Sequence, residues 1–162
     1  SAVVATRSHH PRPAVYVPPP STRSMSLSFH HLGIATADGA DLAATFGGLL
    51  DAPVVHEERF DGMTVRFLEL DGGYFELLEP RADGTIARYL DRQGPGIHHV
   101  AIATDDIDAA LDRARDLGID LVDEAPRSGA WGHDVAFLHP GSTGGVLVEF
   151  VAVDADGANR TV

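Results

Sequence analysis

The chain has 162 residues, a formal net charge of −12 and no cysteine. This length suits one domain with a hydrophobic core, and the absence of cysteine excludes disulfide scaffolds, zinc–thiolate sites and cysteine nucleophiles. Residues 25–162 carry nine arginines against 24 acids, a net charge of −15. This excess predicts no binding to nucleic acid or anionic membranes and is typical of an acidic, halophile-like surface.

The first 24 residues differ in composition from the rest. They hold five of the ten prolines, including VPPP, and show no apolar period. We therefore expect a disordered or extended N-terminal extension over 1–24, one domain over 25–153 and a short C-terminal tail over 154–162. No apolar run reaches the roughly 18 residues that a membrane helix needs, so we expect a soluble, cytoplasmic protein.

From residue 29 a strand, a helix and three strands are expected, and the same order recurs from residue 97. Asp38 is the cap of the first helix, and Asp105 or Asp106 that of the second, which stops at Gly118. The remaining strands are expected over 54–60, 64–70, 74–79, 119–124, 134–139 and 146–151. The predicted fold class is α+β, with two tandem βαβββ modules at about 29–80 and 97–152. Their curved mixed sheet surrounds a metal-containing cleft.

The repeat is clearest in HHLGIATAD (30–38) and HHVAIATDD (98–106), which match at six of nine positions. Because side chains alternate along a strand, His31 and His99 share faces with small residues, where room remains for a ligand. The same alternation places His30 and His98 on the opposite, bulkier faces, against the helices. The repeat therefore presents two equivalent histidines to one cleft.

Each module also ends in a strand with one acid among apolar residues: Glu76 in YFELLEP and Glu149 in VLVEF. A lone histidine is more often a core residue, and a lone strand glutamate is more often exposed. All four at equivalent positions favour a metal site, because two neutral imidazoles and two carboxylates suit a divalent cation. We therefore predict that His31, Glu76, His99 and Glu149 are metal ligands.

Several longer stretches carry a family resemblance: HHLGIA, FELLEP, IARYLDRQGPGIHHVAIATDDI, DEAPRSGAWG and FLHPGSTGGVLVEF. Over residues 29–152 the chain resembles the vicinal oxygen chelate superfamily, with its glyoxalase-like fold, and within it the methylmalonyl-CoA epimerases. The resemblance implies the same four metal ligands and a divalent ion, Co²⁺ first, with Mn²⁺, Zn²⁺, Ni²⁺ or Mg²⁺ as alternatives. It also implies an acyl-CoA substrate and a homodimer.

The implied activity is the interconversion of (2R)- and (2S)-methylmalonyl-CoA through an enolate, in propionate-type metabolism. Glu149 is the first candidate for the general base, and the alternative is that it only binds the metal. Some epimerases have a second glutamate where this chain has Val65. The group that returns the proton on the opposite face of the enolate is therefore not assigned. The candidates are Asp61, Glu57, a bound water and the substrate's own carboxylate.

The contacts to CoA are also open, because Trp131 and Gly141 replace the family's usual histidine and lysine. Arg127, in the glycine-containing stretch APRSGAWG, is the candidate for binding substrate phosphates, and the alternative is a solvated surface arginine. The turn GSTGG (141–145) could bind a phosphate or simply join two strands. We interpret His56, His133 and His139 as structural or surface residues.

Two other functions fit the same sequence. One is a lactoylglutathione lyase, the glyoxalase I type of isomerase, which could use the same four ligands. The other is a metal-free small-molecule-binding protein, like the superfamily members that sequester antibiotics, which would need no ligands. An extradiol dioxygenase fits less well, because its iron site needs only two histidines and one carboxylate.

Overall fold

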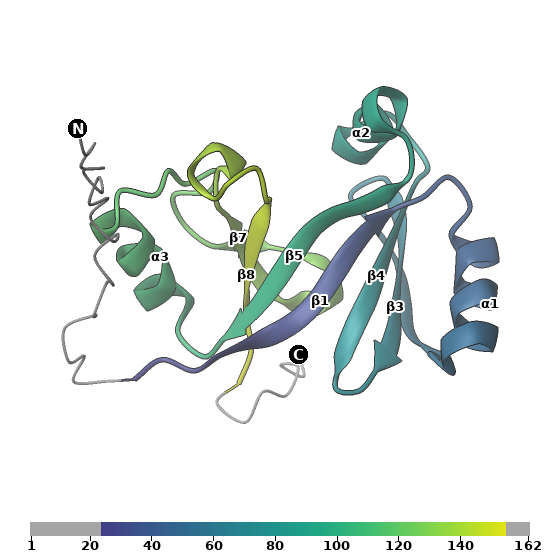
Figure 1. Cartoon of the computed structure of the whole chain (residues 1–162), viewed down its shortest axis with the longest axis horizontal. Coiled ribbons are helices and arrows are strands. Elements are labelled where there is room, and N and C mark those ends of the chain that lie inside the picture. Colours follow the sequence, from purple (N-terminus) through teal and green to yellow (C-terminus); the bar gives the residue numbers. More distant parts are fainter. Residues whose placement is uncertain (1–23, 155–162) are drawn as a thin grey trace, which may run out of the picture.

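A computed structural model describes residues 24–154 (Figure 1). The predicted extension (1–24) and tail (154–162) lie outside the described residues except for Ser24 and Asp154, so the domain boundaries remain predictions. The elements, in chain order, are β1 (Leu27–Ala35), α1 (Gly39–Leu50), β2 (Val54–Phe60), β3 (Met63–Leu70), β4 (Gly73–Pro80), α2 (Thr85–Gln93), β5 (Gly96–Thr104), α3 (Ile107–Asp116), β6 (Arg127–Ser128), a 3₁₀ turn (Ala130–Gly132), β7 (Asp134–Phe137), a second 3₁₀ turn (Pro140–Ser142) and β8 (Val148–Ala152).

Within the described residues, the eight strands form one mixed sheet in the order β2-β3-β4-β1-β5-β8-β7-β6. The two modules meet at its centre, where β1 and β5 are antiparallel neighbours. Each of these strands is parallel to the last strand of its own module, β1 to β4 and β5 to β8. The α+β fold class predicted from the internal repeat is confirmed, and Figure 1 shows β1 and β5 running side by side between the two modules.

The two modules begin their first helices in the same way. The Asp38 carboxylate accepts a hydrogen bond from the backbone N–H of Asp41, and that of Asp106 accepts one from Ala109, each at 3.0 Å. Both aspartates are therefore N-caps, as the sequence predicts for Asp38 and for one of its two candidates in the second module. Among residues 24–154 no helix has the length and apolar character needed to cross a membrane.

The helices α1 and α3 cover the outer face of the sheet. In the first module, Leu68 and Leu77 pack with Leu42 and Phe46 of α1. In the second module, Ile107 and Leu111 of α3 pack with a set of outer-face residues, namely Ala136, Leu138 and Ala152. The inner face, which we define as the face bearing His31, Glu76, His99 and Glu149, is left to form the site.

Three elements differ from the sequence prediction, one of which is the two-residue strand β6, which the sequence does not predict. Helix α2 was not predicted, and its Ile86 packs with Val65 on the inner face. The strand predicted over 119–124 is wrong, because this segment contributes only an isolated bridge between Leu121 and Leu138. The carboxylate of Asp123 accepts a hydrogen bond from the backbone N–H of Phe137 at 2.8 Å. A side chain therefore takes a donor that a regular strand would have paired.

Candidate metal centre and adjoining cavity

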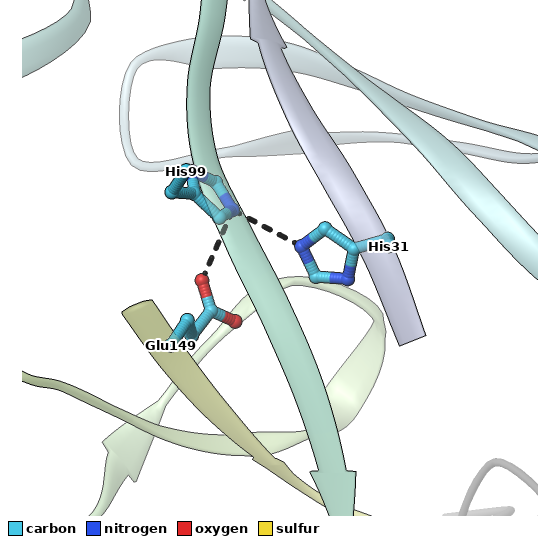
Figure 2. Close-up of side chains that lie close together, drawn as sticks. All are labelled: His31, His99 and Glu149. Carbon is cyan, nitrogen blue, oxygen red and sulfur yellow. Dashed lines mark hydrogen bonds and ion pairs between the residues drawn. The ribbon is translucent and has the colours of Figure 1, made fainter. Parts of the chain in front are cut away.

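The four predicted ligands converge from the four central strands. His31 Nε2 lies 2.9 Å from Glu76 Oε2 and 3.1 Å from His99 Nε2. His99 Nε2 lies 3.2 Å from both Glu76 Oε2 and Glu149 Oε2. Figure 2 shows the imidazoles of His31 and His99 turned toward each other, with the Glu149 carboxylate beside His99. All four side chains are buried, at 2–6% exposure, so the sheet brings them together away from bulk water.

Strand register explains this convergence. Gly33 is paired with Glu76 on one side and His99 on the other. Ala101, the repeat-equivalent position, is paired with Glu149 and His31. Each small residue therefore leaves space above it for a histidine and a glutamate. At Gly33 the space is fully used, because an added Cβ would lie 2.0 Å from His99 Cε1.

The first histidine of each pair lies elsewhere than alternation predicts. The pairing of β1 with β5 skips His30 between Phe29 and His31, and it skips His98 between Ile97 and His99. Each skipped residue forms a β-bulge, which bends the strand and breaks the alternation of faces. The prediction that His30 and His98 lie on the outer face, against the helices that follow Asp38 and Asp106, is therefore wrong. Instead, the Nδ1 atoms of His30 and His31 are 2.7 Å apart, and those of His98 and His99 are 2.9 Å apart.

The electrostatics distinguish the two carboxylates. Burial, the largest cause, raises the pKa of Glu149 to about 8, and the nearby negative charge of Glu76 acts in the same direction. Burial also acts to raise the pKa of Glu76, but the charges and hydrogen bonds of His31 and His99 outweigh it and hold that pKa well below its usual range. Burial lowers the pKa of His98 to about 4, with His99 adding to the shift.

The donor set fits a divalent cation. Ligand atoms of His31, His99 and Glu149 lie within 4.8 Å of one another, and Glu76 Oε2 is close to both imidazoles. Two imidazole nitrogens and two carboxylates are ligands that first-row divalent metals accept, and the two negative charges balance the cation. The site is therefore compatible with such an ion, which would offset the cost of burying two carboxylates.

A cavity of about 150 Å³ adjoins this cluster. Its lining is partly apolar and partly polar, and the polar residues include Glu76, His99 and Glu149 of the cluster. The residues that line the cavity include Phe60, Asp61, Met63, Val65, Glu76, Leu78, Ile86, His98, His99, Arg127 and Glu149.

The structure separates the remaining candidates by position. Arg127 and Asp61 line the cavity. Arg127 also forms an ion pair with Asp123 at 3.0 Å. Glu57 is not among the lining residues and forms an ion pair with Arg66 Nε at 2.8 Å. Asp61 is therefore better placed than Glu57 to meet a ligand.

The other histidines have structural contacts. The ring of His56 stacks on Trp131, with centroids 4.7 Å apart and planes at 5°, and the backbone N–H of Trp131 donates to the Glu58 carboxylate. These contacts fasten the second module onto β2 of the first. His133 Nδ1 lies 3.2 Å from the Ala152 carbonyl oxygen, and His139 Nδ1 accepts from the backbone N–H of Gly141. Gly141 therefore lies in the turn that His139 caps.

The sequence does not predict the contacts that His30, His98 and Tyr89 make in the structure. The ring of Tyr89, on α2, meets the ring of His98 edge to face at 4.8 Å, and its hydroxyl donates to the Ile97 carbonyl oxygen. Helix α2 therefore helps to hold His98. The repeated His-His dipeptide is the sequence signal for the two first histidines, whereas Tyr89 gave no such signal.

Paired βαβββ modules around a buried His-Glu cluster define a glyoxalase-type protein. Residues 30–137 match the Glyoxalase/Bleomycin resistance protein/Dioxygenase superfamily, and the chain belongs to this superfamily. Ethylmalonyl-CoA/methylmalonyl-CoA epimerase from Cereibacter sphaeroides is 37% identical over 129 residues, 76% of this chain and 96% of that protein.

Solved structures of similar proteins carry related names. Methylmalonyl-CoA epimerase from Mycobacterium tuberculosis has a TM-score of 0.74 at 34% identity, over 79% of this chain and 89% of that one. A variant of Streptomyces coelicolor methylmalonyl-CoA epimerase, in complex with 2-nitronate-propionyl-CoA, also has a TM-score of 0.74, at 32% identity over 83% of this chain and 98% of that one. These similar proteins are named as epimerases, a class of isomerase.

Proposed function

We propose that this protein is a metal-dependent epimerase that interconverts (2R)- and (2S)-methylmalonyl-CoA through an enolate. The observation that carries the proposal is the buried convergence of His31, Glu76, His99 and Glu149 beside a small cavity. The names of similar proteins support the same reaction. The proposal includes the homodimer and the cytoplasmic location expected from the sequence.

In this proposal, the four converging side chains hold a divalent cation, with Co²⁺ as the first expectation. When bound, the cation supplies positive charge that stabilises an enolate oxygen. The protein contributes a water-poor pocket and a fixed arrangement of donors. Because both carboxylates are buried, they have few competing water contacts.

Inversion at the α-carbon begins with removal of its proton by a base within reach. Glu149 lines the cavity. A carboxylate that would hold the cation is ionised and can therefore accept a proton from carbon. We therefore propose Glu149 as the base, and its alternative role is that of a ligand alone.

The proton must return on the opposite face of the enolate. Val65, which stands where some family members have a glutamate, is a fully buried part of the cavity wall and cannot carry a proton. Among described residues, the cavity-lining carboxylates are Asp61, Glu76 and Glu149, and Glu76 and Glu149 are proposed ligands. We therefore propose Asp61 as the second acid.

The apolar and charged residues of the rest of the cavity would match the apolar and anionic groups of the substrate. Met63, Val65, Leu78 and Ile86 form an apolar wall, against which an α-methyl group would pack and which would exclude water. Arg127 at the cavity rim would bind an anionic group of the acyl-CoA, because its guanidinium can form two parallel hydrogen bonds to a carboxylate or phosphate.

The decisive experiment is an NMR time course in D₂O with methylmalonyl-CoA, and in parallel with the hemithioacetal of methylglyoxal and glutathione. We expect deuterium at C2 of methylmalonyl-CoA, loss of this exchange with a chelator, and recovery with Co²⁺ or Mn²⁺. Conversion of the hemithioacetal alone would indicate a lactoylglutathione lyase instead. Absence of both reactions and of bound metal would indicate a binding protein.

A further inference from the structure

The first histidine of each pair, His30 and His98, is outside the proposed ligand set but touches it in the same way twice. Each is the bulged residue of its strand. Each places its Nδ1 within hydrogen-bonding distance of Nδ1 of the following histidine, at 2.7 Å in the first module and 2.9 Å in the second. One contact of this kind could be incidental, whereas its recurrence at repeat-equivalent positions indicates a common role.

The chemistry of this contact fixes the position of a proton. Two imidazole nitrogens at this distance share one hydrogen, so one ring donates and the other accepts. A histidine that binds a cation through Nε2 must carry its proton on Nδ1. The Nδ1–H groups of His31 and His99 therefore donate, and the Nδ1 atoms of His30 and His98 accept.

We propose that His30 and His98 are positioning residues that hold His31 and His99 in the Nδ1–H tautomer, with both Nε2 lone pairs aimed at the shared site. The inference rests on the proposed function, because this tautomer matters only if Nε2 binds a cation. Figure 2 shows that the facing atoms of His31 and His99 are the ring nitrogens joined by the dashed line, which are their Nε2 atoms.

A neutral acceptor is consistent with the charge of the site. Ligating histidines often donate their second N–H to a carboxylate, which adds negative charge. Here Glu76 and Glu149 already balance a divalent cation, so a third carboxylate would leave a net negative charge in a buried site. A neutral imidazole orients the ligand without adding charge.

The test uses matched pairs of variants, His30→Asn with His30→Leu, and His98→Asn with His98→Leu. Asparagine and leucine have the same branched shape, but only asparagine has an acceptor oxygen near the position of Nδ1. Calorimetric titration with Mn²⁺ should give affinities within about threefold of wild type for the asparagine variants and about 10- to 100-fold weaker for the leucine variants.

NMR of histidine nitrogens in the zinc-loaded wild type gives a second readout. We expect slowly exchanging protons on Nδ1 of His31 and His99, each with a scalar coupling across the hydrogen bond to Nδ1 of the preceding histidine. The proposal is overturned if these couplings are absent, or if the asparagine and leucine variants bind Mn²⁺ equally. Thermal unfolding checks that each variant folds, and if a leucine variant does not, the wild-type NMR result decides.

These measurements separate the inference from the function on which it rests. Cation binding without deuterium exchange would refute the epimerase and leave the affinity and tautomer tests intact. No cation binding by the wild type would overturn both proposals.

Discussion

Cation binding should release a proton from Glu149 near neutral pH. Burial raises the pKa of this carboxyl to about 8, so the ion-free protein at pH 7 holds roughly 0.9 of a proton there. A carboxylate must lose its proton to bind a metal. At pH 9 the same group holds only roughly 0.1 of a proton. The proton released on binding should therefore fall steeply between these two pH values.

The assay is calorimetric titration of chelator-treated protein with Mn²⁺ in buffers of different ionisation enthalpy, at pH 7 and pH 9. Wild type should release roughly 0.9 of a proton more than Glu149→Gln at pH 7, and roughly 0.1 more at pH 9. Glu76→Gln is the matched comparison. Because the pKa of Glu76 lies below its usual range, this group is already ionised and releases no proton of its own. Its negative charge helps to raise the pKa of Glu149, so its replacement should lower the release at pH 7 by less than Glu149→Gln does. Equal release by wild type and Glu149→Gln at pH 7 would refute the reasoning.

The same raised pKa predicts how the stability of the ion-free protein varies with pH. The folded protein binds a proton at Glu149 more tightly than the unfolded chain does, so this contribution is fully present below pH 4.5 and is lost as the pH rises through 8. The shift corresponds to at most about 5 kcal/mol in the free energy of unfolding. Urea denaturation between pH 5 and 8 should show the decline, and Glu149→Gln should flatten it. Glu76 contributes to the stability with the opposite sign. Because its pKa is lowered from 4.5, this contribution changes only at pH values below the range of the measurement.

Three further substitutions test the site. Gly33→Ala places a Cβ 2.0 Å from His99 Cε1, so Mn²⁺ affinity should fall about tenfold or more in calorimetry, and unchanged affinity would contradict the packing. Asp61→Asn should lower kcat by about 10²- to 10⁴-fold. Asp71→Asn, in a turn of the same left-handed conformation, should not lower it, and equal effects would refute the role of Asp61. Arg127→Gln should raise KM about tenfold with kcat nearly unchanged, and a fall in kcat alone would contradict a binding role.

The sequence predicts the four converging side chains because the same residue type occurs at the equivalent position of each module. Alternation alone placed His31 and His99 on one face, and the repeat matched Glu76 with Glu149. These predictions depend on the period of a strand, which holds wherever the strand is regular. The strands β2, β3 and β4 also lie within a residue of their predicted bounds.

The wrong predictions lie where the local geometry breaks the alternation of side chains along a strand. A bulge leaves no mark in apolar periodicity, so His30 and His98 were assigned to the wrong face. The segment 119–124 has the composition of a strand, but Asp123 takes the backbone donor of Phe137 with its side chain. Helix α2 is short, and its packing on the inner face depends on residues distant in sequence.

The pairing of β1 with β5 explains why the site needs both modules. Gly33 of the first module is paired with His99 of the second, and Ala101 of the second with His31 of the first. Each imidazole therefore lies beside the small residue of the other module. Each glutamate, in contrast, is paired with the small residue of its own module, Glu76 with Gly33 and Glu149 with Ala101. A single module would supply one histidine and one glutamate, too few to hold a cation against water. Duplication of the module supplies the complete donor set. The two copies bring it together where β1 and β5 pair as antiparallel strands.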